Sequence, residues 1–287
     1  MPSGIGMQYQ TQGRVDNWGI ESSLRAQIIQ KRDLGWTAVV NFSMNRNKLV
    51  DFDGSGHSNL NANRFLGVPI NPIYGYRWIG IVQEEDTDYI AATGVQPGSP
   101  KFADLGTESI EGMPDGKPDG KITTADREIL GYNQEAFRMS LSNTVTWKNW
   151  SLYVMVNGVF SGGKYGWAEN RYAYVSNDSM AWTNVFNHPF WTKENRNNTY
   201  PSATVDDERL TALQRYGFVR LQDVNLSYDF RGNSFLQKIG VASLQLYVSG
   251  RNLFFLAPGW DYSDPEVRNP RSQQLARTYT FGVNVRF

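Results

Sequence analysis

Apolar and polar residues alternate with a period of two along most of this chain. In residues 35–47, mainly polar positions lie between Trp36, Ala38, Val40, Phe42 and Met44. The same alternation reaches the C-terminal residue through Tyr279, Phe281, Val283, Val285 and Phe287. Successive side chains of a β-strand point to opposite faces, so the pattern predicts strands that are apolar on one side only.

Seven segments are predicted to be strands, over residues 18–29, 35–47, 136–147, 150–160, 216–230, 241–255 and 275–287. Short turns alternate with long connections, which cover residues 48–135, 161–214 and 256–273. Compact soluble domains seldom contain loops of this length, whereas outer-membrane barrels have short periplasmic turns and long extracellular loops. The chain is therefore predicted to be all-β, an antiparallel portion of a transmembrane β-barrel with long extracellular loops.

An odd number of strands cannot close such a barrel. Single-chain bacterial barrels have even strand numbers, and a barrel in hydrocarbon leaves no strand edge unpaired. The first and last predicted strands would each have an open edge. Further strands are therefore expected to come from outside this sequence.

The amino-acid composition agrees with a membrane barrel. Aromatic residues make up 14% of the chain, with 15 Tyr, 15 Phe and 9 Trp, although the mean hydropathy is negative. A barrel accounts for both, because lipid-facing and lumen-facing residues alternate and rings collect at the two interfaces. The formal net charge is zero, so nothing draws the chain to nucleic acid, and no nucleic-acid partner is expected.

A soluble β-sandwich is the alternative fold, because its strands also alternate apolar and polar residues. It would make the protein a soluble or surface-anchored glycan-binding protein without transport activity. Aromatic residues near the predicted strand ends and the asymmetry of loop lengths favour the barrel. These aromatic residues include Trp18, Trp36, Trp147, Trp150, Phe254, Phe255 and Phe287.

The sequence contains no run of about 18 apolar residues, which a membrane-spanning helix requires. Its first residues also lack the basic patch and apolar segment of a secretory signal. Because an outer-membrane protein needs such a signal, the chain is expected to be a fragment or a mature portion. The absence of cysteine fits an oxidising envelope compartment.

Several stretches of the chain together resemble the SusC/RagA family of TonB-linked outer-membrane proteins. They keep the family's order over residues 15–21, 67–70, 73–81, 119–122, 126–131, 190–195, 200–201, 218–224, 246–254 and 278–287. The last stretch is similar to the terminal strand that the barrel-assembly machinery recognises. Members of the family are several times longer, and their plug domain, TonB-binding segment and earlier strands have no counterpart here.

The resemblance implies a location and a set of partners. It makes the seven strands the last of a 22-stranded barrel in the outer membrane of a Gram-negative, Bacteroidetes-type bacterium. It implies uptake of oligosaccharides or peptides, a SusD-like lipoprotein over the outer mouth, and energy from the TonB complex through the absent N-terminal part. Outer-membrane lipid would surround the strands.

Residues 115–126 follow the spacing of an EF-hand-type calcium loop. Position 3 of this loop is Lys117, whose ammonium removes a ligand and repels a dication. Two interpretations stay open, a weakened calcium site and a turn that keeps the shape without metal, and Lys117 favours the turn. Apart from this calcium ion, no cofactor is expected. The oxygen ligands would come from Asp115, Asp119, the carbonyl of Lys121, Thr123 and Asp126.

The long loop over residues 161–214 is rich in aromatic rings that could stack on sugar rings. Packing of such a ring against the rim or a covering protein is the more common role for any single residue. The candidate substrate-binding residues are Trp167, Tyr172, Tyr174, Trp182 and Trp191.

The sequence predicts no enzyme. Residues 158–164 resemble part of a phosphate-binding loop, but Tyr165 stands where Ser or Thr must hold magnesium, and no helical pattern follows. His57 and His188 lie in separate loops without metal-pair spacing. Pairs such as Asp206 and Asp207 are interpreted as solvated loop charges, so no catalytic residue is predicted.

Overall fold

The computed structural model describes residues 13–170, 187–205, 207–230, 236, 238–261, 263–267 and 272–287. The chain divides into two compact units. One unit comprises Gly19–Asn45, Gln134–Ala168 and Leu213–Phe287 and contains most of a large sheet; the other comprises Met1–Trp18, Arg46–Asn133 and Glu169–Ala212. Each unit is described separately below.

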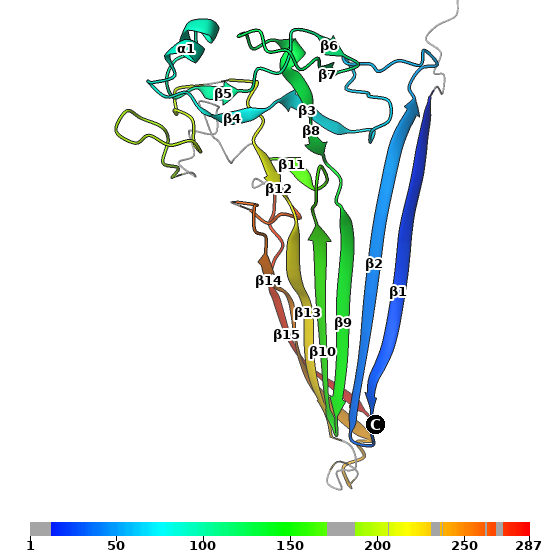
Figure 1. Ribbon diagram of the computed structural model, residues 1–287. Coiled ribbons are helices and arrows are strands. Elements are labelled where there is room, and N and C mark those ends of the chain that lie inside the picture. Colours follow the sequence, from blue (N-terminus) through cyan, green and yellow to red (C-terminus); the bar gives the residue numbers. More distant parts are fainter. Residues whose placement is uncertain are drawn as a thin grey trace, which may run out of the picture. The chain divides into compact units, whose positions relative to one another are not determined.

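Seven strands form one sheet, and their order in the sheet is their order in the chain (Figure 1). This confirms the antiparallel all-β fold expected from the alternation. The first two strands are longer than predicted, with 17 and 18 residues. The strands are β1 (Arg14–Gln30), β2 (Leu34–Asp51), β9 (Phe137–Trp147), β10 (Trp150–Phe160), β13 (Phe218–Asp229), β14 (Ser243–Leu256) and β15 (Thr278–Arg286).

The pairing register keeps apolar residues beside apolar residues across the sheet. One row of paired positions consists of Trp36, Val145, Leu152, Leu226, Val248 and Phe281. The next row consists of Thr37, Thr144, Tyr153, Asn225, Ser249 and Thr280. Side chains of neighbouring rows point to opposite sides of the sheet. The side that carries the first row is called the apolar face below, and the side that carries the second row is called the polar face.

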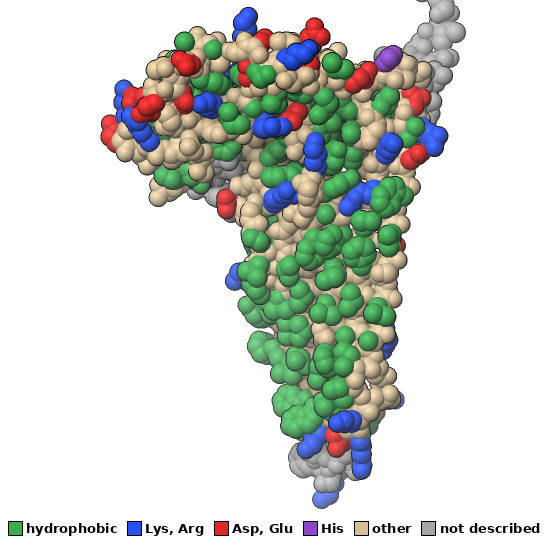
Figure 2. Space-filling model, viewed as in Figure 1, with side chains coloured by type: hydrophobic (Ala, Val, Ile, Leu, Met, Phe, Trp, Pro, Cys, Tyr) green, Lys and Arg blue, Asp and Glu red, His purple; other side chains and the backbone are tan. Residues whose placement is uncertain are grey.

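Side chains of the apolar face are exposed. Phe281 is 82% exposed, and Trp147, Trp150, Leu246 and Val283 are exposed as well. Figure 2 shows hydrophobic side chains gathered over the strands of the sheet. An exposed apolar surface of this extent marks an interaction with a protein or a membrane.

Aromatic rings lie near both ends of the apolar face. At the end where long loops leave the sheet, the rings of Phe137 and Phe160 stack with centroids 4.6 Å apart. At the end with the short turns, the rings of Trp150 and Tyr228 meet at 4.7 Å. Between these ends β9 has 11 residues, which gives roughly 37 Å along the strand and roughly 28 Å at a 40° tilt, close to the apolar band of about 25 Å in outer-membrane barrels.

Asn143 is a polar residue on the apolar face and is paired there. Asn143 occupies a position between Ala38 and Val154. Its carbonyl oxygen accepts a hydrogen bond of 3.0 Å from the indole nitrogen of Trp36. The bond satisfies a donor and an acceptor together, which lowers the cost of placing both in apolar surroundings.

A small hydrophobic cluster forms within the same unit. It consists of the buried residues Val159, Ala168, Tyr216, Phe218 and Trp260. Val159 pairs with Phe218 across β10 and β13, next to residues of the polar face. The cluster also includes Trp260, from the connection that follows β14, and so holds that connection against the sheet.

The other unit is built from short elements. Three two-stranded ribbons pair β3 with β8, β4 with β5, and β6 with β7. The bounds are β3 (Pro72–Tyr76), β4 (Trp78–Ile81), α1 (Thr87–Thr93), β5 (Pro100–Phe102), β6 (Ser109–Ile110), β7 (Met113–Pro114), the 3-10 helix η1 (Thr124–Asp126) and β8 (Arg127–Tyr132). A fourth ribbon, most of which belongs to the unit of the large sheet, joins β11 (Trp167–Glu169) to β12 (Leu213–Arg215).

The short elements surround a core of their own, which includes Ile81, Val82, Phe102 and Trp191. Neither helix is long: α1 has 7 residues and η1 has 3. In the part of the chain that the structure describes, no helix has the length and apolar character needed to cross a membrane.

Position 282 should accept only glycine, because the ring of Tyr247 lies over it. It pairs with Tyr247 across β14 and β15, and an added Cβ would overlap the Tyr247 ring. We expect Gly282→Ala to lower the free energy of unfolding by about 1–3 kcal/mol, as overpacking does, when measured by urea unfolding in lipid vesicles. Gly162→Ala is the matched control, because a Cβ there meets only Ala136 at 3.8 Å. If Gly282→Ala lowered the free energy of unfolding equally in the wild type and in a Tyr247→Ala variant, this explanation would be contradicted.

Candidate functional site

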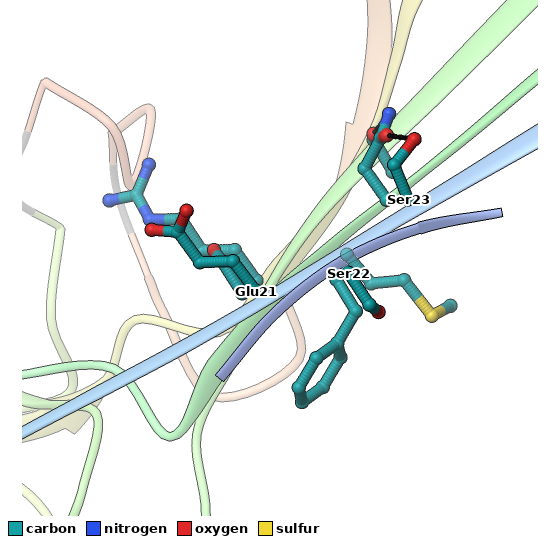
Figure 3. Close-up of a pocket in the computed structure, with 9 residues that line it drawn as sticks. Glu21, Ser22 and Ser23 are labelled. Carbon is teal, nitrogen blue, oxygen red and sulfur yellow. Dashed lines mark hydrogen bonds between the residues drawn. The ribbon is translucent and has the colours of Figure 1, made fainter. Parts of the chain in front are cut away.

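The polar face of the sheet is the candidate functional surface, because its side chains carry the hydrogen-bonding groups. Across β1, β2 and β9, the hydroxyl of Ser23 donates to Asn41 at 2.7 Å, and the Asn41 amide donates to Ser140 at 3.1 Å. Figure 3 shows Glu21 and Ser23 on one side of β1 and Ser22 on the other. These three residues contribute to an open pocket of about 510 Å³ that also includes Phe42 and Met139 of the apolar face.

Several charged residues of the polar face are paired. Asp223 and Arg251 are opposite each other on β13 and β14, with 3.2 Å between Oδ2 and Nε. Three residues before Asp223 on β13, Arg220 is buried, with 1% of the residue exposed. Its Nη2 donates to Asp264 Oδ1 at 2.6 Å, and its Nε lies 2.9 Å from Glu266 Oε2.

The Arg220 cluster is a feature that sequence reasoning missed. Arg220 and Asp264 are 44 residues apart in the chain, and no motif marks them as partners. Their closeness depends on the long connection after β14 folding back over the sheet. The only signal in the sequence is an arginine inside a predicted strand, which is also common on a solvated strand face.

The structure places the five predicted calcium ligands in the unit of short elements, in three different local settings. Asp115 accepts hydrogen bonds from the backbone and hydroxyl of Thr107, both at 3.0 Å. Asp119 accepts from the backbone of Lys121 at 2.9 Å, and the Thr123 hydroxyl accepts from the backbone of Ala125 at 3.2 Å. Most of these bonds hold turns and caps.

Asp126 is fully buried and has three backbone donors. Its Oδ1 accepts from Leu105 at 2.7 Å and from Gly106 at 3.1 Å, and its Oδ2 accepts from Thr123 at 2.6 Å. The carboxylate therefore ties residues 105–106 to the start of η1. In this arrangement it closes a loop through hydrogen bonds to the backbone.

Lys117 lies beside the carboxylate that would be the first calcium ligand. Its ammonium is 3.6 Å from Asp115 Oδ2. Burial opposes ionisation of Asp115, but hydrogen bonds from Lys117 and Thr107 outweigh it and lower the pKa of this carboxyl. Among the described residues, no three His, Cys, Asp or Glu side chains are grouped to hold a metal ion. Calcium binding stays a prediction, which a calcium titration of the protein would test.

Two of the five candidate substrate-binding aromatics lie in described parts of the chain. Trp167, in β11, has the guanidinium of Arg215 4.0 Å from its ring centroid. Trp191 is 6% exposed, and its indole nitrogen donates to Gln83 Oε1 at 2.9 Å. Trp191 therefore packs inside its unit, which agrees with the packing interpretation, and a role in sugar binding stays a prediction. Tyr172, Tyr174 and Trp182 lie outside the described residues.

Comparison with known proteins gives relatives along almost the whole chain. The TonB-dependent receptor P3 of Formosa agariphila is 30% identical over 318 aligned residues, which cover 99% of this chain and 30% of that receptor. The TonB-dependent receptor P26 of the same organism is 24% identical, with the same coverage. The chain thus spans about 30% of the length of the curated relatives it matches. No protein-family model matches it.

Solved structures show the same fold. A structure of the RagAB peptide transporter superposes with a TM-score of 0.71 at 21% identity, over 99% of this chain and 31% of that one. The RagAB peptide importer in its "closed-closed" state gives a TM-score of 0.68 at 19% identity. At this identity the likeness establishes the fold: the seven-stranded sheet and its connections match one portion of that transporter chain.

Asp126 should contribute more to the unit of short elements than Asp119 does. Asp126→Asn replaces one acceptor oxygen by an amide that faces a backbone donor, so we expect a loss of about 1.5–3 kcal/mol. Hydrogen exchange of residues 104–126, followed by mass spectrometry, would report the loss as faster exchange. Asp119→Asn is the matched control, because its carboxylate bonds only within an exposed turn. Equal effects of the two variants would show that the loop is not organised around Asp126.

Proposed function

Because this chain belongs to the TonB-dependent receptors, we propose that it forms the carboxy-terminal part of the barrel of a SusC-like outer-membrane nutrient importer. One observation carries the proposal: a continuous apolar sheet face is exposed and has aromatic rings near both ends. Lipid is the surrounding that stabilises such a face. The polar face would then line the passage for the imported molecule.

The soluble sandwich is not favoured by the exposed side chains. In a sandwich, the inner residues of each sheet pack against a second sheet about 10 Å away. Here Phe281, Leu246 and Trp150, which belong to the apolar face, are exposed within the described structure. In water these residues would form an aggregation-prone surface, whereas in a bilayer they would contact acyl chains.

Strands outside this chain would complete the barrel in our proposal. β1 and β15 are the outermost strands of the sheet, and a strand edge within hydrocarbon must be paired. The chain matches about 30% of its relatives, which leaves room for further strands and for a plug domain. The family resemblance supports seven strands out of 22.

Further features of the importer rest on the same resemblance. We place the connections over residues 48–135, 161–214 and 256–273 outside the cell, in a Gram-negative, Bacteroidetes-type bacterium. The substrate would be an oligosaccharide or a peptide, and the RagAB peptide transporter supports a peptide. A SusD-like lipoprotein would cover the outer mouth, and TonB would supply energy through a part of the protein outside this chain. The relatives are receptors, which supports transport over catalysis.

An arginine should be tolerated on one face of β13 and not on the other. Val224 lies on the apolar face beside Val154, and Asn225 lies on the polar face beside Tyr153. We expect Val224→Arg to destabilise the protein in phospholipid vesicles by about 2–4 kcal/mol, as arginine does near the bilayer midplane. The adjacent variant Asn225→Arg should cost far less, because water fills the lumen. Urea unfolding measures both, and equal costs would remove the membrane assignment of the apolar face.

Uptake can be tested in the source bacterium. Deletion of the gene should abolish growth on either oligosaccharides or peptides as sole carbon source, and the gene on a plasmid should restore growth. The protein should fractionate with the outer membrane. Unchanged growth on both nutrient classes, with the protein in the water-soluble fraction, would reject the importer and favour the glycan-binding alternative.

A further inference from the structure

A cavity of about 620 Å³ lies on the polar side of the sheet, where β13 and β14 approach their long connections. Its walls come from both strands and from the connection after β14, all within one unit. The lining residues used below are Arg220, Trp260, Ser263, Asp264, Gln274 and Arg277. They combine buried charge, an aromatic ring and hydrogen-bond donors.

One wall of the cavity is fixed by the buried ion pair. Arg220 and Asp264 are 1% and 7% exposed. The guanidinium of Arg220 also lies 5.2 Å from the ring centroid of Phe255 and 5.4 Å from that of Phe218. Asp264 and Glu266 together more than balance the positive charge of Arg220, so this residue serves as scaffold.

Several acceptors around the cavity already take part in hydrogen bonds. Asp264 Oδ1 accepts from Arg220 at 2.6 Å and from the backbone of Glu266 at 3.0 Å. Gln274 accepts from the backbone of Asp264 at 3.0 Å and donates to Ser272 at 3.2 Å. A ligand would therefore find few protein acceptors for its own donors.

The unused groups are donors. Trp260 is 5% exposed, and its indole N–H is buried without a hydrogen-bond partner. A buried donor without a partner is costly, and the Trp260 ring is held by the cluster around Phe218. Ser263 and Arg277 also line the cavity, and neither has a hydrogen bond or ion pair within the described residues. The donor set is thus an indole N–H, a hydroxyl and a guanidinium.

We infer that this cavity binds a carboxylate group of the imported molecule. A carboxylate accepts several hydrogen bonds at once and donates none, which matches the donors of Trp260, Ser263 and Arg277. Arg277, which is exposed at the cavity, would supply the guanidinium for the ligand, because Arg220 is already paired with two carboxylates. The inference rests on the proposed function, which places the polar face along the passage. The carboxylate can belong to the C-terminus of a peptide or to a uronic acid of an oligosaccharide.

Calorimetric titration of the full-length protein in detergent would test the cavity with four probes. These are tetra-alanine, its C-terminal amide, trigalacturonate and the methyl ester of trigalacturonate. At least one acid should bind about tenfold or more tightly than its neutral counterpart. A preference for tetra-alanine over its amide would identify a peptide terminus as the ligand group, and a preference for trigalacturonate over its methyl ester would identify a uronate. Equal binding of both acids and their neutral counterparts would overturn the inference.

The Trp260→Phe variant locates the binding in this cavity. It keeps an aromatic ring and removes the indole N–H, which has no internal partner, although the smaller ring fills less of the buried cluster. Urea unfolding would check that the variant is folded, and affinity for the acid should fall about tenfold to a hundredfold. Trp150→Phe on the apolar face is the matched control and should bind like the wild type. Unchanged affinity of Trp260→Phe would reject the site. Failure of the importer proposal would appear separately, in the Val224→Arg experiment, which does not involve this cavity.

Discussion

Backbone hydrogen bonding without water is the constraint on which the rest of this structure depends. A strand in hydrocarbon must pair every N–H and C=O with a neighbouring strand, because an unsatisfied group costs several kcal/mol. The five inner strands, β2 to β14 in the sheet, have neighbours on both sides. β1 and β15 have one each, so in the proposed membrane setting the same constraint would require additional strands at both edges of the sheet.

Pairing on both sides determines where chemistry can occur. With its backbone satisfied, the sheet differs between its faces only in side chains, and lipid allows only apolar ones on one face. The ion pairs described above lie on the polar face, where Asp223 pairs with Arg251 and Arg220 with Asp264. Asn143, a polar residue on the apolar face, is hydrogen-bonded to Trp36.

The sheet could be predicted from the sequence, whereas the cavity could not. Alternation such as that from Tyr279 to Phe287 is a local signal, and it is strong because one face of every strand meets the same surroundings. The extensions of β1 and β2 beyond the prediction lack this signal, since they continue past the band that alternates. The pairing of Arg220 with Asp264 depends on how a long connection folds, and no spacing encodes it.

Single aromatic residues in the loops were equally difficult to assign. A tryptophan in a polar loop can stack on a ligand or bury its ring, and both roles give the same local sequence. Trp191 is buried because Gln83 accepts its indole hydrogen and the core of its unit surrounds its ring. The predicted calcium loop has the same ambiguity, because oxygen atoms spaced for a metal can also cap backbone donors, as Asp126 does.

A β-bulge in β13 determines which face of the sheet Arg220, a wall residue of the cavity, lies on. The register of β13 shifts between Leu221 and Asp223 relative to β14, and a shift also separates β10 and β13 at this point. Gln222 is the extra residue of β13 opposite β10. If β13 were regular there, strict alternation from Val224 would place Arg220 on the apolar face. The bulge shifts the alternation by one residue, so that Arg220 lies on the polar face. Asn252 of β14, at a φ of 52°, accepts a hydrogen bond of 3.0 Å from Gln222. Bulges are over-represented next to functional sites, and here the bulge turns the guanidinium that anchors the cavity wall away from lipid.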